Sequence, residues 1–167
     1  MRITNCKVNH LTAPLGYWME KPVFSWQVEE AEGNNPITIL NESIRQVNGL
    51  LLKKASEDAD LAGMGTTLVA ACTMGRVLCV ANVGDSRLYV IGREEIRQIT
   101  RDHSLVEELI QRGEMERGSE AYNEHKNIIT RAIGARKDVF ADFFEVNLDE
   151  GDTVLMCSDG LSNMVSD

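Results

Sequence analysis

The sequence predicts an α+β protein in which antiparallel strands pack against helices. Apolar residues recur at helical spacing between residues 37 and 58, and the apolar period then becomes two between residues 66 and 99. Short turn sequences separate the strands of this second region, which is typical of antiparallel hairpins. An amphipathic helix followed by such strands indicates a helix layer on a sheet.

The first 36 residues differ from the rest of the chain. They contain all three prolines and both tryptophans, and segments 3–8 and 23–28 have the character of strands. Turn residues predict a boundary at about 33–36. We therefore expect a weakly β N-terminal extension of different origin over residues 1–36, and a second unit over residues 37–167.

The second unit begins with the amphipathic helix and continues into short strands. Four strands joined by three hairpin turns predict one antiparallel meander, at residues 66–73, 77–82, 88–91 and 96–99. Their apolar faces are nearly continuous, so we expect both faces of the sheet to be covered.

A second helix, a long loop and two strands complete the unit. Asp102 or Ser104 is a suitable helix cap, and an apolar stripe continues from there to Gly113. Residues 113–127 are polar and predict a loop, and a loop of that length in a compact domain is usually functional or mobile. The last strands are predicted at residues 139–146 and 153–157.

The composition excludes several classes of protein. The formal net charge is −9 and no basic run occurs, which argues against nucleic-acid binding. No apolar run is long enough to cross a membrane, and no signal peptide is recognisable at the N-terminus. The four cysteines lack CxxC spacing, so we expect reduced thiols and a cytoplasmic location.

The end of the last strand is a candidate ligand position. Val154 to Cys157 are apolar and predict a buried strand, which breaks at Ser158-Asp159-Gly160. A strand-end carboxylate followed by a flexible glycine is a common way to present a metal ligand. Taken alone, the local pattern favours an ordinary turn, because Asp-Gly is the commonest turn dipeptide.

The order of the motifs along the chain is more specific than any one of them. They are GMGTT (63–67), VANVGDSRLYV (80–90), TRDHS (100–104), NIITRAIG (127–134) and LMCSDGLSNMVSD (155–167). In this order they resemble the metal-dependent Ser/Thr protein phosphatase family (PPM, type 2C) in its bacterial form. The resemblance implies an α-β-β-α sandwich with Mn²⁺ or Mg²⁺ ions at one edge. A metal-activated water then hydrolyses phosphoserine or phosphothreonine in a phosphoprotein substrate, and hard oxygen ligands suit that task.

The resemblance also assigns roles to residues. Asp159 matches a core metal ligand, and Asp85 matches the aspartate that helps hold an additional metal. Gly160 and Asn163 are candidates for weak metal contacts or for support of the ligands, and residues 113–127 match a flap beside the active site. No residue of this chain is assigned as a catalytic acid or base. A further group is expected to support the turn: Gly84, Ser86, Arg87, Asp102 and His103.

The chain also departs from the family pattern. The N-terminal third with its DGMGG motif and the C-terminal GGxDN motif have no counterpart, and Asn163 replaces a usual aspartate. We therefore expect a truncated sandwich, an incomplete metal site, and weak activity or none for the chain alone. The alternative is a non-catalytic phosphatase remnant or binding module. Sheet edges left open in this way predict self-association.

The N-terminal extension carries a second resemblance. The sequences ITN (3–5), NHL (9–11), PLGY (14–17) and KPVFSW (21–26) are similar to the opening β-domain of bacterial α-L-rhamnosidases. They favour, more weakly, a carbohydrate-processing accessory domain. A strand in this extension is also expected to be able to pair with an open sheet edge.

Overall fold

The computed structural model describes residues 2–8, 24–29 and 35–165. Much of the N-terminal extension, including most of the predicted boundary, lies outside these ranges. The elements are β1 (Arg2–Val8), β2 (Phe24–Glu29), α1 (Pro36–Glu57), the short 3-10 helix η1 (Ala59–Leu61), β3 (Leu68–Met74), β4 (Val77–Val83), β5 (Arg87–Ile91), β6 (Ile96–Gln98), α2 (Leu105–Gln111), α3 (Glu120–His125), β7 (Asp142–Asn147), β8 (Thr153–Cys157) and α4 (Asp159–Ser162).

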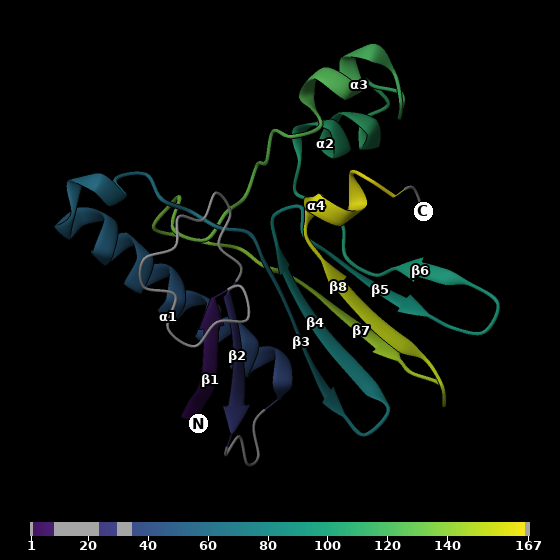
Figure 1. The fold of residues 1–167 in the computed structure, drawn as a ribbon, viewed down its shortest axis with the longest axis horizontal. Coiled ribbons are helices and arrows are strands. Elements are labelled where there is room, and N and C mark those ends of the chain that lie inside the picture. Colours follow the sequence, from purple (N-terminus) through teal and green to yellow (C-terminus); the bar gives the residue numbers. More distant parts are fainter. Residues whose placement is uncertain (1, 9–23, 30–34, 166–167) are drawn as a thin grey trace.

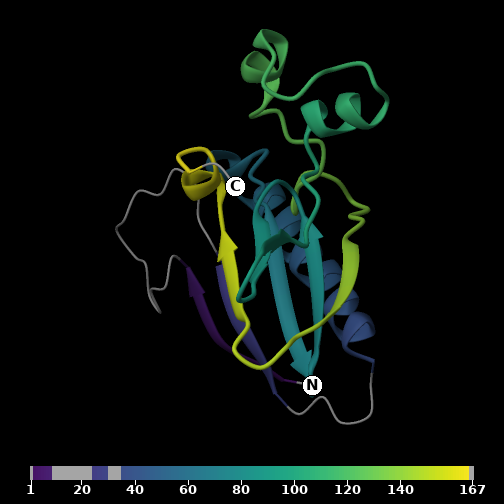
Figure 2. The same ribbon diagram turned by 90° about the vertical axis from the view of Figure 1, so that its right-hand side faces the viewer.

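Three layers make up the body of the protein (Figures 1 and 2). Helix α1 lies on a sheet of order β3-β4-β7, and a second sheet of order β6-β5-β8 lies on its other face. All strand pairs are antiparallel. The predicted α+β class with antiparallel sheets and flanking helices is thus confirmed.

Helix α1 begins and ends with hydrogen-bonded caps. The side chain of Asn35 accepts a 2.9 Å hydrogen bond from the Ile37 N–H, and Pro36 occupies the first turn, where its missing N–H costs nothing. The helix ends at Glu57, before Asp58 as the sequence predicts, and the Asp58 N–H caps it by donating to the Lys54 carbonyl. Its apolar stripe, which includes Leu40 and Ile44, is buried against the first sheet.

Strand β4 is the centre of the fold. Alternate side chains point to opposite faces of a strand, and those of Cys79, Ala81 and Val83 face α1. Leu78 and Val80 face the second sheet. Both faces of this central sheet are therefore covered, as expected.

The predicted single meander is wrong, because its four strands belong to two sheets. Strand β4 pairs with β3 on one edge and β7 on the other, so neither edge is free for β5. Strand β5 pairs with β6 and β8 instead. The connection at residues 84–86 is consequently a crossing between sheets and not a hairpin.

The predicted loop at residues 113–127 contains a helix. Ser119 caps α3 by accepting a hydrogen bond from the Tyr122 N–H at 3.2 Å. Figure 2 shows α2 and α3 projecting beyond one end of the sheets. Helix α4 lies at the same end (Figure 1).

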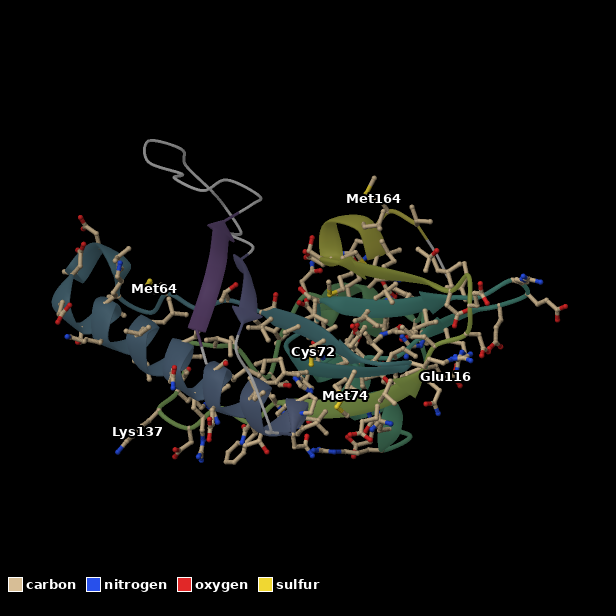
Figure 3. All side chains as sticks on the ribbon, turned by 90° about the horizontal axis from the view of Figure 1, so that it is seen from below. Met64, Cys72, Met74, Glu116, Lys137 and Met164 are labelled. Atoms are coloured by element: carbon tan, nitrogen blue, oxygen red, sulfur yellow. The ribbon has the colours of Figure 1, made fainter. Side chains whose placement is uncertain are left out.

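The prediction that the last strand is buried is wrong. Strand β8 lies at the edge of the second sheet, and Leu155 and Met156 are 36% and 51% exposed. Met164 after α4 points away from the body (Figure 3) and is exposed. Among the described residues no helix layer covers this outer face, so the fourth layer of the expected sandwich is not seen there.

Strands β1 and β2 form a two-stranded sheet of their own. The expected pairing of this extension with an open edge of the main sheets is therefore wrong. The pairing of β1 with β2 occupies one edge of each strand, and among the described residues neither strand pairs with a strand of the main sheets.

Candidate functional site

The main candidate ligands meet at the end of the sheets where the helices gather. Asp85, Asp159 and Asn163 line one small cavity, together with Lys126 from the end of α3. The cavity holds about 20 Å³, which is room for a single water-sized ligand. Asp85 and Asp159 come from distant parts of the sequence, so the fold itself brings the two carboxylates to one place.

Asp85 sits at the tip of a tightly constrained turn. Gly84 has a φ of +107°, a conformation that side-chain-bearing residues rarely adopt. A Cβ atom at this position would lie only 2.4 Å from Cγ2 of Thr67. The Thr67 hydroxyl is in turn 2.8 Å from the Ser86 hydroxyl. The expected structural roles of Gly84 and Ser86 therefore have a specific geometric basis.

The far side of the turn is fixed by a buried ion pair. Arg87 donates to both carboxylate oxygens of Asp102, and its Nη1 donates to the Tyr89 hydroxyl at 3.1 Å. Burial lowers the pKa of the Arg87 guanidinium, but its contacts with Asp102 and Tyr89 outweigh burial and raise the pKa. Arg87 therefore stays charged at the wall of the cavity. Its contacts with Asp102 fix the start of β5, directly after the turn.

His103 is buried behind the turn. Its Nδ1 accepts a hydrogen bond from the Gly84 N–H at 3.0 Å, and the His103 backbone N–H donates to the Gly84 carbonyl at 2.9 Å. Burial lowers the pKa of the His103 imidazole, and Arg131 lowers it further, although Asp142 acts in the opposite direction. The ring is therefore held neutral.

Asp159 is the first residue of α4, directly after β8. Asn163 ends the same short helix, so one helical turn brings both side chains to the same cavity. Gly160 lies within α4, and a Cβ there would approach Ser158 Oγ no closer than 3.4 Å. Close packing therefore does not explain the glycine, and its role as a weak metal contact stays a prediction.

The segment that contains α3 is fastened over the cavity by Arg117. Its Nη2 lies 2.6 Å from Oε2 of Glu107 on α2, and its guanidinium stands over the Tyr122 ring at 5.9 Å. Burial lowers the pKa of Arg117, but Glu107 raises it by more. Arg117, Tyr122 and Lys126 of this segment line the cavity, and the role of residues 113–127 as a flap stays a prediction.

The carboxylates suit one hard cation better than two. Carboxylate and amide oxygens are the donors that Mg²⁺ and Mn²⁺ prefer, and water completes their coordination shells. Within the described residues, no group of three or more His, Cys, Asp or Glu side chains could hold a metal ion. Asp85, Asp159 and Asn163 therefore offer oxygen donors for one ion, and they do not suit a dinuclear centre.

Sequence reasoning missed several residues of this site. Asn82 is fully buried, and its Nδ2 donates to the carbonyl oxygens of Arg101 and Gly84, at 2.8 and 3.3 Å. An asparagine inside an apolar strand was the available signal, because a buried amide needs partners. Lys126 and Arg117 carried no such signal, since their place at the cavity depends on how α3 folds back.

The comparison with known families decides the relationship. The sequence profile described as Protein phosphatase 2C matches residues 20–167. The chain belongs to the protein phosphatase 2C family. The family match begins before the predicted boundary at about 33–36, and the resemblance of the extension to α-L-rhamnosidases is not supported by any of the similar proteins found.

This phosphatase 2C chain has named bacterial relatives. It is 45% identical to Serine/threonine phosphatase stp of Listeria innocua over 128 residues, which are 77% of this chain and 51% of that protein. It is 32% identical over 139 residues to Serine/threonine protein phosphatase PstP of Mycobacterium tuberculosis, covering 83% of this chain and 27% of that protein.

A solved structure has the same fold. The crystal structure of Stp1 from Staphylococcus aureus superposes with a TM-score of 0.78 at 38% identity, covering 84% of this chain and 55% of that chain. This phosphatase 2C chain thus spans about half the length of Serine/threonine phosphatase stp and of Stp1. No helix in the described part is long and apolar enough to cross a membrane.

Proposed function

We propose that the chain carries part of the site of a metal-dependent phosphoserine/phosphothreonine phosphatase. The observation that carries this proposal is the meeting of Asp85 and Asp159 at one cavity, in a chain of the protein phosphatase 2C family. Asp159 is the stronger ligand and Asp85 the weaker one, with Gly160 and Asn163 as secondary contacts. The substrate is a phosphoprotein.

The cation is Mn²⁺ or Mg²⁺, bound by Asp159 and Asp85 and otherwise by water. When bound, such an ion activates water and neutralises phosphoryl oxygens. The residues of this chain orient the two carboxylates through the turn and α4, and the α3 segment limits access of bulk water. In two-metal sites the second ion helps to stabilise the attacking and leaving oxygens, and the described residues offer no ligand group for a second ion. We therefore expect weak turnover or none from the chain alone.

The same geometry also suits a non-catalytic module that binds a cation or a phosphorylated segment without turnover. The two functions are separated by following p-nitrophenyl phosphate and a phosphothreonine peptide with added Mn²⁺. Metal-dependent turnover that Asp159→Ala abolishes supports the enzyme. A folded chain that binds Mn²⁺ without turnover supports the module. A folded chain that binds no Mn²⁺ contradicts the metal site itself.

The edge of β8 favours self-association. The strand contains no charged residue or proline, and Tyr89, Ile91 and Leu155 line an apolar groove beside it. Antiparallel pairing of two β8 edges would join two sheets into one. Light scattering over a concentration series tests this. A dimer that Val154→Pro disrupts is the expected result, and a monomer at all concentrations contradicts it.

The domain division and location are also proposals. Residues 37–167 form the partial phosphatase unit and residues 1–36 form an extension, the second half of which is already included in the family match from residue 20. Helix α1 begins at Pro36, which agrees with this division. Cys72 and Cys79 are free thiols, as a reducing cytoplasmic location would require.

A further inference from the structure

Both peptide groups of Gly84, the residue before Asp85, are held by hydrogen bonds to His103. The Gly84 carbonyl accepts from the His103 N–H at 2.9 Å and from Asn82 Nδ2 at 3.3 Å. The Gly84 N–H donates to His103 Nδ1 at 3.0 Å. The Gly84 carbonyl thus accepts from two donors. The Gly84 N–H donates to one acceptor, His103 Nδ1. The orientation of the residue that leads into Asp85 therefore depends on this imidazole nitrogen.

The hydrogen-bond pattern fixes the tautomer of His103. A nitrogen that accepts from an amide N–H cannot carry a proton, so the proton of the neutral ring is on Nε2. Nε2 lies 3.1 Å from Oδ2 of Asp142, so the ring proton faces this carboxylate. The other oxygen of Asp142 accepts from Arg131 at 2.7 Å. Asp142 and Arg131 therefore favour the ring orientation in which Nδ1 faces Gly84.

His103 also contacts the segment that leaves α3. Its carbonyl oxygen accepts a hydrogen bond from the Thr130 N–H at 2.8 Å. One buried residue, only 4% exposed, thus joins the turn before Asp85, the start of β7 and the base of the α3 segment. An apolar side chain of similar size would fill the same space but would leave the Gly84 N–H buried without an acceptor.

We propose that His103 is a positioning residue for the metal site. Through Nδ1 it holds the Val83–Gly84 peptide that leads into the Asp85 turn, and it thereby sets the affinity of the Asp85 and Asp159 carboxylates for a divalent cation. This positioning role rests on the metal site in the proposed function. It gives His103 a role in metal binding in addition to its support of the fold. Partners that orient metal ligands typically change affinity 10- to 100-fold when removed.

Two substitutions distinguish positioning from packing. In His103→Asn the side-chain oxygen lies near the position of Nδ1 and still accepts a hydrogen bond. In His103→Gln the amide reaches the position of Nε2, and no acceptor remains near Gly84. Asn48→Ala is the matched control, because Asn48 is equally buried at 2% exposure. Its amide bonds to Gly134, Arg136 and Lys137, in a loop beside α1 where Figure 3 shows Lys137.

Two measurements are made on the full chain. Free Mn²⁺ is counted by electron paramagnetic resonance in a titration, and exchange of the Gly84 amide hydrogen is followed by NMR. We expect His103→Gln to weaken Mn²⁺ binding by about tenfold or more and to speed Gly84 exchange. His103→Asn should stay within about threefold of the unchanged chain, and Asn48→Ala should lose stability without losing affinity.

Contrary results have different meanings. If the unchanged chain binds Mn²⁺ and His103→Gln binds it equally well, the positioning role is wrong and the proposed metal site stands. If Asn48→Ala weakens binding as much as His103→Gln does, the effect is general destabilisation and the positioning role is again wrong. If the unchanged chain binds no Mn²⁺, the metal site and the role of His103 both fail.

Discussion

Arg87 holds Asp102 by a two-point ion pair behind the Asp85 turn. Nε lies 3.0 Å from Oδ1 and Nη2 lies 2.8 Å from Oδ2, with both side chains about 15% exposed. Removing one partner leaves the other charge buried, which typically costs about 3–5 kcal/mol. We expect Asp102→Ala to lower the free energy of unfolding by about that amount in urea denaturation.

The exposed ion pair of Arg76 with Asp149 is the control for this prediction. Its N–O distance is also 2.8 Å, but the side chains are 71% and 86% exposed. Solvent screens such a pair, so Asp149→Ala should change stability by less than about 1 kcal/mol. Equal losses for the two substitutions would show that burial does not determine the contribution of Asp102.

Gly84→Ala should disrupt the same turn from the other side. The substitution combines a strained φ of +107° with a Cβ position 2.4 Å from Thr67. We expect a loss of about 3 kcal/mol or more in the free energy of unfolding. A fall in soluble yield at 37 °C should accompany it.

Gly75→Ala separates backbone strain from overlap. Gly75 has a φ of +61°, and a Cβ there would meet nothing within 4 Å. Only the cost of the left-handed conformation remains, about 1 kcal/mol. If both alanine variants lose the same stability, the close contact with Thr67 is not what requires glycine at position 84.

The sequence was most informative where one local rule decides the structure. Helix α1 followed from the spacing of Leu40 and Ile44, and the Asp85 and Asp159 pair followed from motif order. The pairing of strands that are distant in sequence could not be predicted. No residue of β4 indicates that β7, and not β5, pairs with its second edge. The exposure of β8 also depends on what lies against it, and an apolar run such as Val154–Cys157 looks the same in a covered and an uncovered strand. The bond from His103 to Gly84 depends on the crossing between sheets, so motif order alone could not reveal it.

Stability should fall between about pH 7 and pH 5 because of His103. Its pKa is lowered from 6.5 in the folded state by burial and by Arg131, against the opposing effect of Asp142 and Asp102. Near and below pH 6.5, His103 therefore binds more protons in the unfolded chain than in the folded protein. The contribution is complete above about pH 6.5 and is lost as the pH falls, by at most about 1.4 kcal/mol per pH unit for one proton.

Urea denaturation at several pH values measures this slope, and His103→Asn should flatten it. Burial raises the pKa of the Asp142 carboxyl, but its contacts with His103 and Arg131 outweigh burial and lower the pKa from 3.8. Its contribution is present above its ordinary pKa and is lost only at lower pH, outside this window. An unchanged slope in His103→Asn would assign the pH dependence to other groups.

Arg117→Ala should loosen the α3 segment without unfolding the protein. The Arg117 side chain is 56% exposed and that of Glu107 is 18% exposed, so screening limits the pair to less than about 1 kcal/mol of global stability. Its local effect is larger, because the pair and the Tyr122 ring contact tie residues 113–127 to α2. Hydrogen exchange of the amides in that segment should rise several-fold.

Arg112→Ala is the control, since Arg112 lies 4.0 Å from Glu108 on the exposed face of one helix. Faster exchange in both variants would mean that loss of charge near α2 is sufficient, and that the contact between Arg117 and Glu107 does not hold the segment over the cavity.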